Sequence, residues 1–162
     1  MEQREIKFNI TVFEKESEML KEDQELVAAA REAATRAYAK YSHFQVGAAI
    51  LLANGKIITG NNQENSAYPS GLCAERTTAF YASATFPGVP FKKIAITAIN
   101  PVHPLDYPAT PCGACRQVLS EYEHKYGKPI EVILSGQKGE IWKIDSIESL
   151  LPLSFGAEAL PE

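Results

Sequence analysis

Residues 46–52 form an almost wholly apolar run (Val-Gly-Ala-Ala-Ile-Leu-Leu), and Asn54-Gly55 follows closely. A β-strand that is apolar on both sides has to be buried on both faces of its sheet. Asn-Gly is a strong signal for a tight hairpin turn, which predicts that strands over 45–53 and 56–61 are antiparallel neighbours. The sheet that contains this hairpin therefore needs helices on each of its faces.

Three segments with helical spacing of apolar residues can supply that cover. They are expected to span residues 23–40, 72–84 and 110–126. Side chains that are common N-caps, or glycine, stand at the expected helix starts: Asp23, Ser70 or Gly71, and Thr110. In the first helix the apolar face is expected to continue from Leu26 to Tyr41. Pro111 suits the first position of the third helix, and Gly127 suits its end.

Four further strands are expected from apolar runs or from strict alternation: 6–13, 92–99, 130–134 and 141–143. In the first of them, every second residue from Ile6 to Val12 is apolar. Strands that alternate with helices along the chain are typical of an α/β fold, in which a sheet is covered on both faces.

Composition and charge restrict the partners of the chain. The 162 residues suffice for one domain with a sizeable core. The net charge is −4, and the 16 Lys and Arg residues are scattered, so no nucleic-acid partner is expected. No apolar run reaches about 18 residues, so no membrane association is expected. Because the polar N-terminus does not resemble a secretory signal, we expect a cytoplasmic protein.

The three cysteines are the residues most indicative of chemistry. Cys112 and Cys115 stand three residues apart at an expected helix start, so their side chains share one face. Cys73 also lies near a helix start, where the positive end of the helix dipole favours thiolates. Three thiolates on one zinc ion leave the fourth tetrahedral position for water, as in catalytic zinc sites. The alternatives are a redox pair beside a buried Cys73, or a structural zinc site closed by a fourth ligand.

Glu75 follows Cys73 by two residues. In the middle of a helix, two side chains at that spacing point in different directions, because each residue turns about 100°. Glu75 can therefore share a pocket with the metal only if Cys73 lies at the irregular start of the helix. The alternative is a first-turn glutamate that interacts favourably with the helix dipole. Periodicity alone does not decide between these interpretations.

Residues 73–75 (Cys-Ala-Glu) and 111–117 (Pro-Cys-Gly-Ala-Cys-Arg-Gln) resemble the zinc deaminase signature, with cysteine in place of the first histidine. That variant resembles the short cytidine deaminases that act on free nucleosides. Residues 41–49 (Tyr-Ser-His-Phe-Gln-Val-Gly-Ala-Ala) and 60–65 (Gly-Asn-Asn-Gln-Glu-Asn) strengthen the resemblance. Together the similar segments lie within residues 26–156.

The resemblance implies a three-layer α/β/α sandwich with a five-stranded mixed sheet. It implies one zinc ion per subunit and hydrolytic deamination of cytidine and deoxycytidine to uridine and deoxyuridine, as in pyrimidine salvage. Short members of the family are usually homotetramers, so the resemblance implies self-association, as a homotetramer, as well. Residues 1–22 precede the usual family core and are assigned as an N-terminal extension, while residues 23–162 are assigned as the catalytic domain.

The resemblance also implies roles for individual residues. Zinc would be held by Cys73, Cys112 and Cys115, and Glu75 would shuttle protons. The substrate would be contacted by Phe44 at the cytosine ring, by Asn62 and Glu64 at the ribose, and by the backbone of Ala74 at the base. Supporting roles would fall to Arg76, which would donate hydrogen bonds to the thiolates, and to Tyr68 and Phe155, which match positions contributed across a subunit boundary. The alternatives are core packing for Phe44 and Phe155, a solvated loop for Asn62 and Glu64, and a surface position for Arg76.

One expectation concerns substrate choice. A buried Glu64 carboxylate without a hydroxyl partner would be destabilising, so free cytosine is expected to be a poor substrate. Two rival functions remain open: a deaminase that acts on another cytosine compound or on polynucleotide, and a zinc domain without enzymatic activity. The rival zinc domain requires a fourth protein ligand and an idle Glu75.

Overall fold

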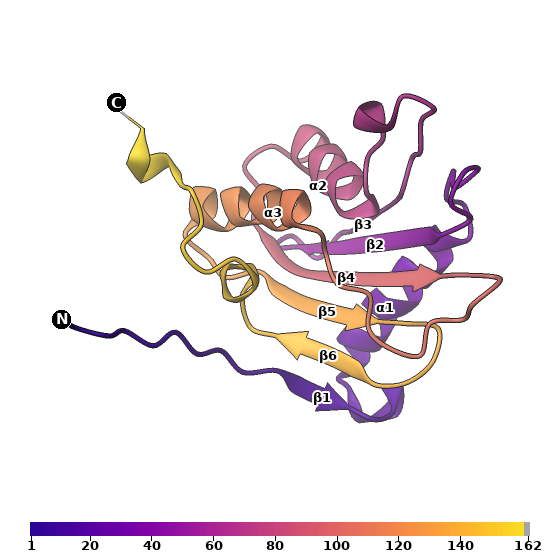
Figure 1. Ribbon diagram of the computed structural model, residues 1–162, viewed down its shortest axis with the longest axis horizontal. Helices are drawn as coiled ribbons and strands as arrows, with labels where there is room; N and C mark the ends of the chain where they lie inside the picture. The colour runs from indigo at the N-terminus through magenta and orange to yellow at the C-terminus, as the bar shows by residue number, and fades with distance from the viewer. Residues whose placement is uncertain (161–162) are drawn as a thin grey trace.

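The computed structural model describes residues 1–160, in which one mixed sheet carries helices on both faces (Figure 1). The strands are β1 (Thr11–Phe13), β2 (Gln45–Leu52), β3 (Ile57–Asn61), β4 (Phe91–Ile99), β5 (Glu131–Ser135) and β6 (Ile141–Ile144). The helices are α1 (Lys21–Ala34), α2 (Ala74–Thr85) and α3 (Gly113–Tyr126). None of the helices in this part of the chain is both long and apolar enough to cross a membrane.

The strand order is β1-β6-β5-β4-β2-β3. The pair β4 and β5 is parallel, and the other neighbouring pairs are antiparallel. The resemblance implies five strands, whereas the sheet has six, because β1, expected from the alternation in residues 6–13, joins it beside β6. The strand expected over 6–13 is shorter than predicted, since pairing with β6 reaches only Thr11–Phe13.

The burial of β2 on both faces is confirmed. Successive side chains of a strand point to opposite faces, and Ala49 and Ile50 lie in two different cores. Ala49 packs with Leu26 and Ala30 of α1, whereas Ile50 packs in the core that includes Leu119 of α3 and residues of α2. The chain is therefore the three-layer sandwich that was expected, with α1 on one face and α2 and α3 on the other.

The ends of α1 differ from the prediction. The helix begins at Lys21, after Leu20 as N-cap, and ends at Ala34 rather than at residue 40. Tyr41 therefore lies outside the helix. Asp23 is not the N-cap but belongs to the first turn, where its side chain is almost fully buried.

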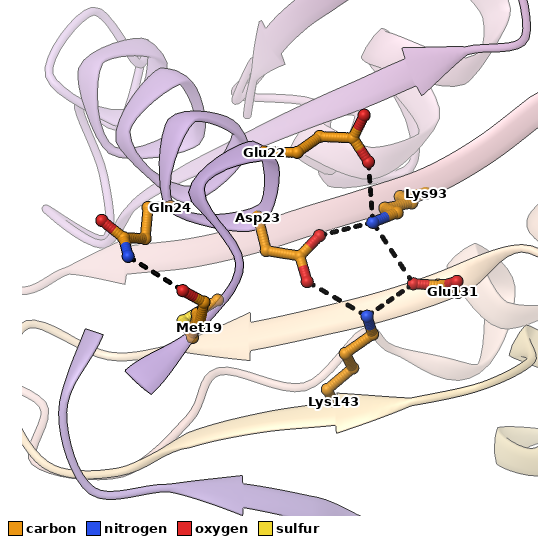
Figure 2. Close-up of polar contacts among 7 residues, drawn as sticks. All are labelled: Met19, Glu22, Asp23, Gln24, Lys93, Glu131 and Lys143. Carbon is orange, nitrogen blue, oxygen red and sulfur yellow. Dashed lines mark hydrogen bonds and ion pairs between the residues drawn. The ribbon is translucent and has the colours of Figure 1, made fainter. Parts of the chain in front are cut away.

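Asp23 is buried because it joins an ion-pair network on the sheet face that α1 covers (Figure 2). Lys93 Nζ of β4 lies 2.6 Å from Asp23 Oδ1 and 2.8 Å from Glu22 Oε1. Lys143 Nζ of β6 lies 3.0 Å from Asp23 Oδ2 and 2.7 Å from Glu131 Oε2 of β5. The network thus ties the start of α1 to three strands.

The starts of α2 and α3 also differ from the prediction. Their N-caps are Cys73 and Cys112, not the predicted Ser70 or Gly71 and Thr110. The predicted end of α3 is confirmed, since Gly127 follows it with the left-handed φ of 58°. Both cysteines that begin helices thus have extended rather than helical backbone, which matters for the site they form.

Candidate active site

Three cysteine sulfurs meet where α2 and α3 begin. Cys73 and Cys112 are the N-caps of the two helices, and Cys115 lies in the first turn of α3. The Sγ atom of Cys112 lies 3.9 Å from that of Cys73 and 3.4 Å from that of Cys115, and all three sulfurs lie within 4.8 Å of one another. Sulfurs bound tetrahedrally to zinc at about 2.3 Å stand roughly 3.8 Å apart, so the spacing fits one ion.

The electrostatics of the three thiols also fit a metal cation. Contact with the Cys115 thiol, and to a smaller extent Arg76 and Cys112, lowers the pKa of Cys73 to about 5, although burial acts in the opposite direction. The same contact with Cys73, together with burial, raises the pKa of Cys115. Thiols this close oppose each other's ionisation, because like charges repel. A cation between them removes that conflict, and the group could hold one metal ion.

Glu75 lies in the first turn of α2, and its side chain is only 4% exposed. The condition for its sharing a pocket with the cysteines is met, because Cys73 has extended backbone at the N-cap. Burial is the largest influence on Glu75 and raises the pKa of its carboxyl group. A carboxyl group with a raised pKa takes up and releases protons nearer to neutral pH, as general acid–base catalysis requires.

These side chains open onto a cavity of about 860 Å³ between the start of α2, the loop that precedes β2 and the loops that follow β3 and β4. That volume lies in the range of small-molecule sites. Eight of the sequence-predicted site residues line it: Phe44, Asn62, Glu64, Tyr68, Cys73, Glu75, Arg76 and Cys112. Cys115 and Ala74 are fully buried and do not line the cavity. Residues from four separate segments of the sequence therefore line one cavity.

The Asn62 side chain fixes the start of β2. Its Oδ1 accepts a hydrogen bond from the Val46 backbone amide at 2.8 Å, and its Nδ2 donates to the Phe44 carbonyl at 3.0 Å. These bonds hold Phe44, which is half-buried, on the cavity wall. Asn62 thus orients a neighbouring wall residue, and one of its two amide hydrogens remains for a ligand.

Glu64 is neither fully buried nor without a partner. Its carboxylate accepts hydrogen bonds from the backbone amides of Tyr41 at 2.8 Å and Ser42 at 3.2 Å, and from the Ser42 hydroxyl. The bond from the Ser42 hydroxyl lowers the pKa of Glu64. The premise that an unpaired, buried Glu64 rejects free cytosine is therefore wrong, since the loop at residues 41–42 satisfies the carboxylate. The preference for a nucleoside over cytosine stays a prediction.

The supporting residues differ in position. Arg76 Nη2 lies 3.9 Å from Cys73 Sγ, in hydrogen-bonding range of a thiolate. Tyr68 is exposed at the cavity rim. Phe155 is exposed and does not line the cavity; its carbonyl accepts a hydrogen bond from Gln117 at 2.9 Å.

Residues 105–109 form a side of the cavity for which sequence patterns predicted no role. Gln137, in the turn between β5 and β6, holds this loop, because its Oε1 accepts from the backbone amides of Asn100 at 2.8 Å and Leu105 at 3.2 Å. The loop packs so tightly on this turn that a Cβ on Gly139 would lie 2.1 Å from the Asp106 carbonyl oxygen. A single glutamine in a turn carries no recognisable signal. The sequence signal that could have indicated this wall of the cavity is Leu105, an apolar residue within a polar loop.

Residues 20–126 match the family described as the cytidine and deoxycytidylate deaminase zinc-binding region. The chain belongs to this family. The match includes all three cysteines and Glu75, so the donor set is that of a zinc-binding family.

Individual relatives agree with the family assignment. A cytidine deaminase from Sporosarcina psychrophila is 39% identical over 85% of this chain and 93% of its own length. A cytidine deaminase from Halalkalibacterium halodurans is 39% identical over 83% of this chain and 95% of its own. The crystal structure of cytidine deaminase from Burkholderia pseudomallei superposes with a TM-score of 0.70 and 41% identity, covering 81% of this chain and 97% of that one. The layered fold is therefore that of solved family members.

Proposed function

We propose that this chain catalyses the hydrolytic deamination of cytidine and deoxycytidine to uridine and deoxyuridine, a reaction of pyrimidine salvage. The observation that carries the proposal is the meeting of three cysteine sulfurs with the buried Glu75 at one cavity. Membership of the zinc-binding deaminase family and the cytidine deaminases among its relatives support the choice of substrate. A structural zinc domain would have no need for a buried carboxyl group beside the metal.

The residues of the chain account for the steps of the reaction. Cys73, Cys112 and Cys115 would hold the zinc ion, which would lower the pKa of a bound water so that it can act as a nucleophile at neutral pH. Glu75 takes a proton from the attacking water and delivers it to N3 of cytosine. Once the oxygen is bonded to C4, Glu75 moves the remaining hydroxyl proton to the 4-amino group, and the C4–N bond breaks to release ammonia. The water oxygen remains on C4, and the product is uridine.

Substrate contacts belong to the same proposal. Phe44 stands on the cavity wall and is assigned to the cytosine ring, with the backbone of Ala74 at the edge of the base. Asn62 and Glu64 line the adjacent wall and are assigned to the ribose. Arg76 is assigned to the Cys73 thiolate, whose charge its guanidinium offsets.

Three further expectations are part of the proposal. Residues 1–22 are an extension and residues 23–162 the catalytic domain. The enzyme is a cytoplasmic homotetramer, in which Tyr68 and Phe155 complete a neighbouring site; their exposure is compatible with that role. Sedimentation of the zinc-loaded protein measures the number of subunits directly.

The loss of ultraviolet absorbance from cytidine tests the function. We expect turnover of cytidine and deoxycytidine, loss of activity with a zinc chelator and recovery when zinc is returned. Cytosine and a single-stranded cytidine oligonucleotide serve as parallel substrates, and both are expected to react much more slowly. Absence of cytidine turnover by the zinc-loaded protein would contradict the proposal, and faster turnover of the oligonucleotide would favour the polynucleotide alternative.

Gln137→Ala is expected to raise KM for cytidine by about fivefold to tenfold with a smaller change in kcat. The variant removes two hydrogen bonds to the loop that forms one wall of the cavity, each worth about 1 kcal/mol. Steady-state kinetics measure both constants. Gln137→Glu keeps an acceptor oxygen and should retain most of the affinity, and the exposed Lys138→Ala is the neutral control. Equal KM values for the alanine variant and the wild type would show that the loop is held by other contacts.

A further inference from the structure

The N-terminal residues form an arm, residues 1–10, that continues β1 beyond the sheet (Figure 1). On one side of the arm and β1, the apolar side chains of Ile6, Phe8, Ile10 and Val12 are 40 to 60% exposed. Within the described part of the chain, residues 6–9 have no backbone hydrogen-bond partner. The arm is therefore an extended segment with an unpaired backbone and a half-exposed apolar face, of which Ile6 and Phe8 also line a surface hollow beside residues 148–154.

The outer edge of β1 is equally unused, because β1 is the terminal strand of the sheet. Natural proteins protect such edges with proline, bulges or several charged residues. Residues 5–13 contain no proline or glycine and two charged residues, Glu5 and Lys7, so the short length of β1 and these two charges are the protections that this edge has. The family match begins at residue 20, and the arm lies outside it. An edge of this kind is suited to pairing with another strand.

We propose that the arm and β1 pair with the same segment of a second copy of this chain, antiparallel, about a two-fold axis at Asn9. In this register Ile6 faces Val12, and Phe8 faces Ile10, in both directions. Because alternate residues share a face, the two apolar stripes join into one on the same side of a continuous sheet. Trp142, which pairs with Val12 on β6, extends that stripe in each copy.

Charge complementarity selects this register. When the pairing continues one residue beyond β1 to the bend at Glu14, Arg4 of each copy faces Glu14 of the other, and the apolar stripe ends in an opposite-charge pair at both ends. Within one copy, Arg4 makes only an exposed contact with Glu2, and Glu14 has no ion-pair partner among residues 1–160. Both charges are thus available to a second copy, since an exposed contact of that kind contributes little.

The neighbouring registers are worse on the apolar face. Moving the axis to Phe8 places Val12 opposite Arg4, and moving it to Ile10 places Ile6 opposite Glu14. Each shift therefore sets a charge against an apolar side chain. On the opposite face, Phe13 meets a polar residue in all three registers, so that face does not discriminate among them. The register about Asn9 alone gives every apolar residue of the stripe an apolar partner.

The contact can be trapped by a disulfide. In Asn9→Cys the two introduced thiols face each other across the axis, where paired Cα atoms are about 4.5–5.5 Å apart, within disulfide range. We expect the zinc-loaded, full-length variant to form a covalent dimer in oxidised glutathione, read on a non-reducing gel. In Lys7→Cys, equally exposed, the two thiols would be about 14 Å apart along the strands and should stay unlinked. Wild type under the same oxidant controls for the native cysteines.

The register is tested by exchanging charges in the Asn9→Cys background. Arg4→Glu and Glu14→Arg should each slow cross-linking about fivefold, because two attractive pairs become repulsive, and the double variant should restore the rate. If Asn9→Cys does not cross-link, or Lys7→Cys does so as fast, the arm contacts another surface or another partner and the proposal is wrong. Single charge variants that cross-link at the unmodified rate would refute the register. These outcomes do not depend on the catalytic activity.

Discussion

Replacing Glu75 with glutamine is expected to lower kcat for cytidine by roughly 10²–10⁴-fold while the protein stays folded and keeps its zinc. Glutamine has nearly the same shape but cannot take up a proton from water or pass one to the base. Glu75 is buried at the first turn of α2 and makes no ion pair within residues 1–160, so the fold does not depend on its charge. The loss should therefore fall on turnover.

Steady-state kinetics with parallel measurement of zinc content and circular dichroism separate this result from misfolding. Glu64→Gln is the matched control, since Glu64 is assigned to the ribose and not to proton transfer. That control should raise KM more than it lowers kcat. A Glu75→Gln enzyme with wild-type kcat would remove Glu75 from the mechanism, and one that has lost its zinc would assign Glu75 a structural role instead.

Asp23→Asn is expected to lower the free energy of unfolding by about 3 kcal/mol. Asp23 is almost fully buried and neutralises both Lys93 and Lys143, so the neutral amide leaves two lysines short of a counter-charge. This loss of unfolding free energy lies at the lower end of the range for broken buried ion pairs, because the carboxylates of Glu22 and Glu131 still face the two lysines (Figure 2). Urea unfolding of the zinc-loaded proteins measures the difference.

The effect of Asp23→Asn should depend on pH. Burial raises the pKa of Asp23, but hydrogen bonds from Lys93 and Lys143 lower it by more, so the net pKa lies below the ordinary 3.8. Its contribution is therefore present above about pH 4 and is lost as pH falls through the folded-state pKa, where the two proteins should converge. Glu22→Gln, at a half-exposed partner of Lys93, should lose under about 1 kcal/mol. Equal losses for both variants would contradict the role of burial.

The parts of the fold that could be predicted are those set by local sequence. The apolar run of β2 and the Asn54-Gly55 turn specify the hairpin without help from the rest of the chain. The alternation from Ile6 to Val12 predicts the strand that became β1, but its length depends on a distant partner, since pairing with β6 reaches only Thr11–Phe13. The early end of α1 also has a tertiary cause. The chain turns after Ala34, and the backbone amide of Tyr38 donates a hydrogen bond to the Asn62 carbonyl oxygen at 3.0 Å.

The candidate site likewise contains residues that local sequence predicts and residues that depend on tertiary contacts. The cysteines and Glu75 could be found because their types and spacing are unusual and match a signature. The helix starts were misplaced because the N-cap positions of α2 and α3 hold cysteines and not the polar caps that propensity favours. Gln137 could not be found, because its contacts with Asn100 and Leu105 span more than 30 residues of sequence.

The placement of Cys73 and Cys112 affects how the protein must be handled. Neither side chain caps its helix with a hydrogen bond, and the two residues are 39 positions apart in sequence. An ion bound by both cross-links the beginnings of two helices, so the energy of metal binding becomes part of the energy of folding. Melting temperatures of two preparations can therefore be compared only when their metal occupancy is the same.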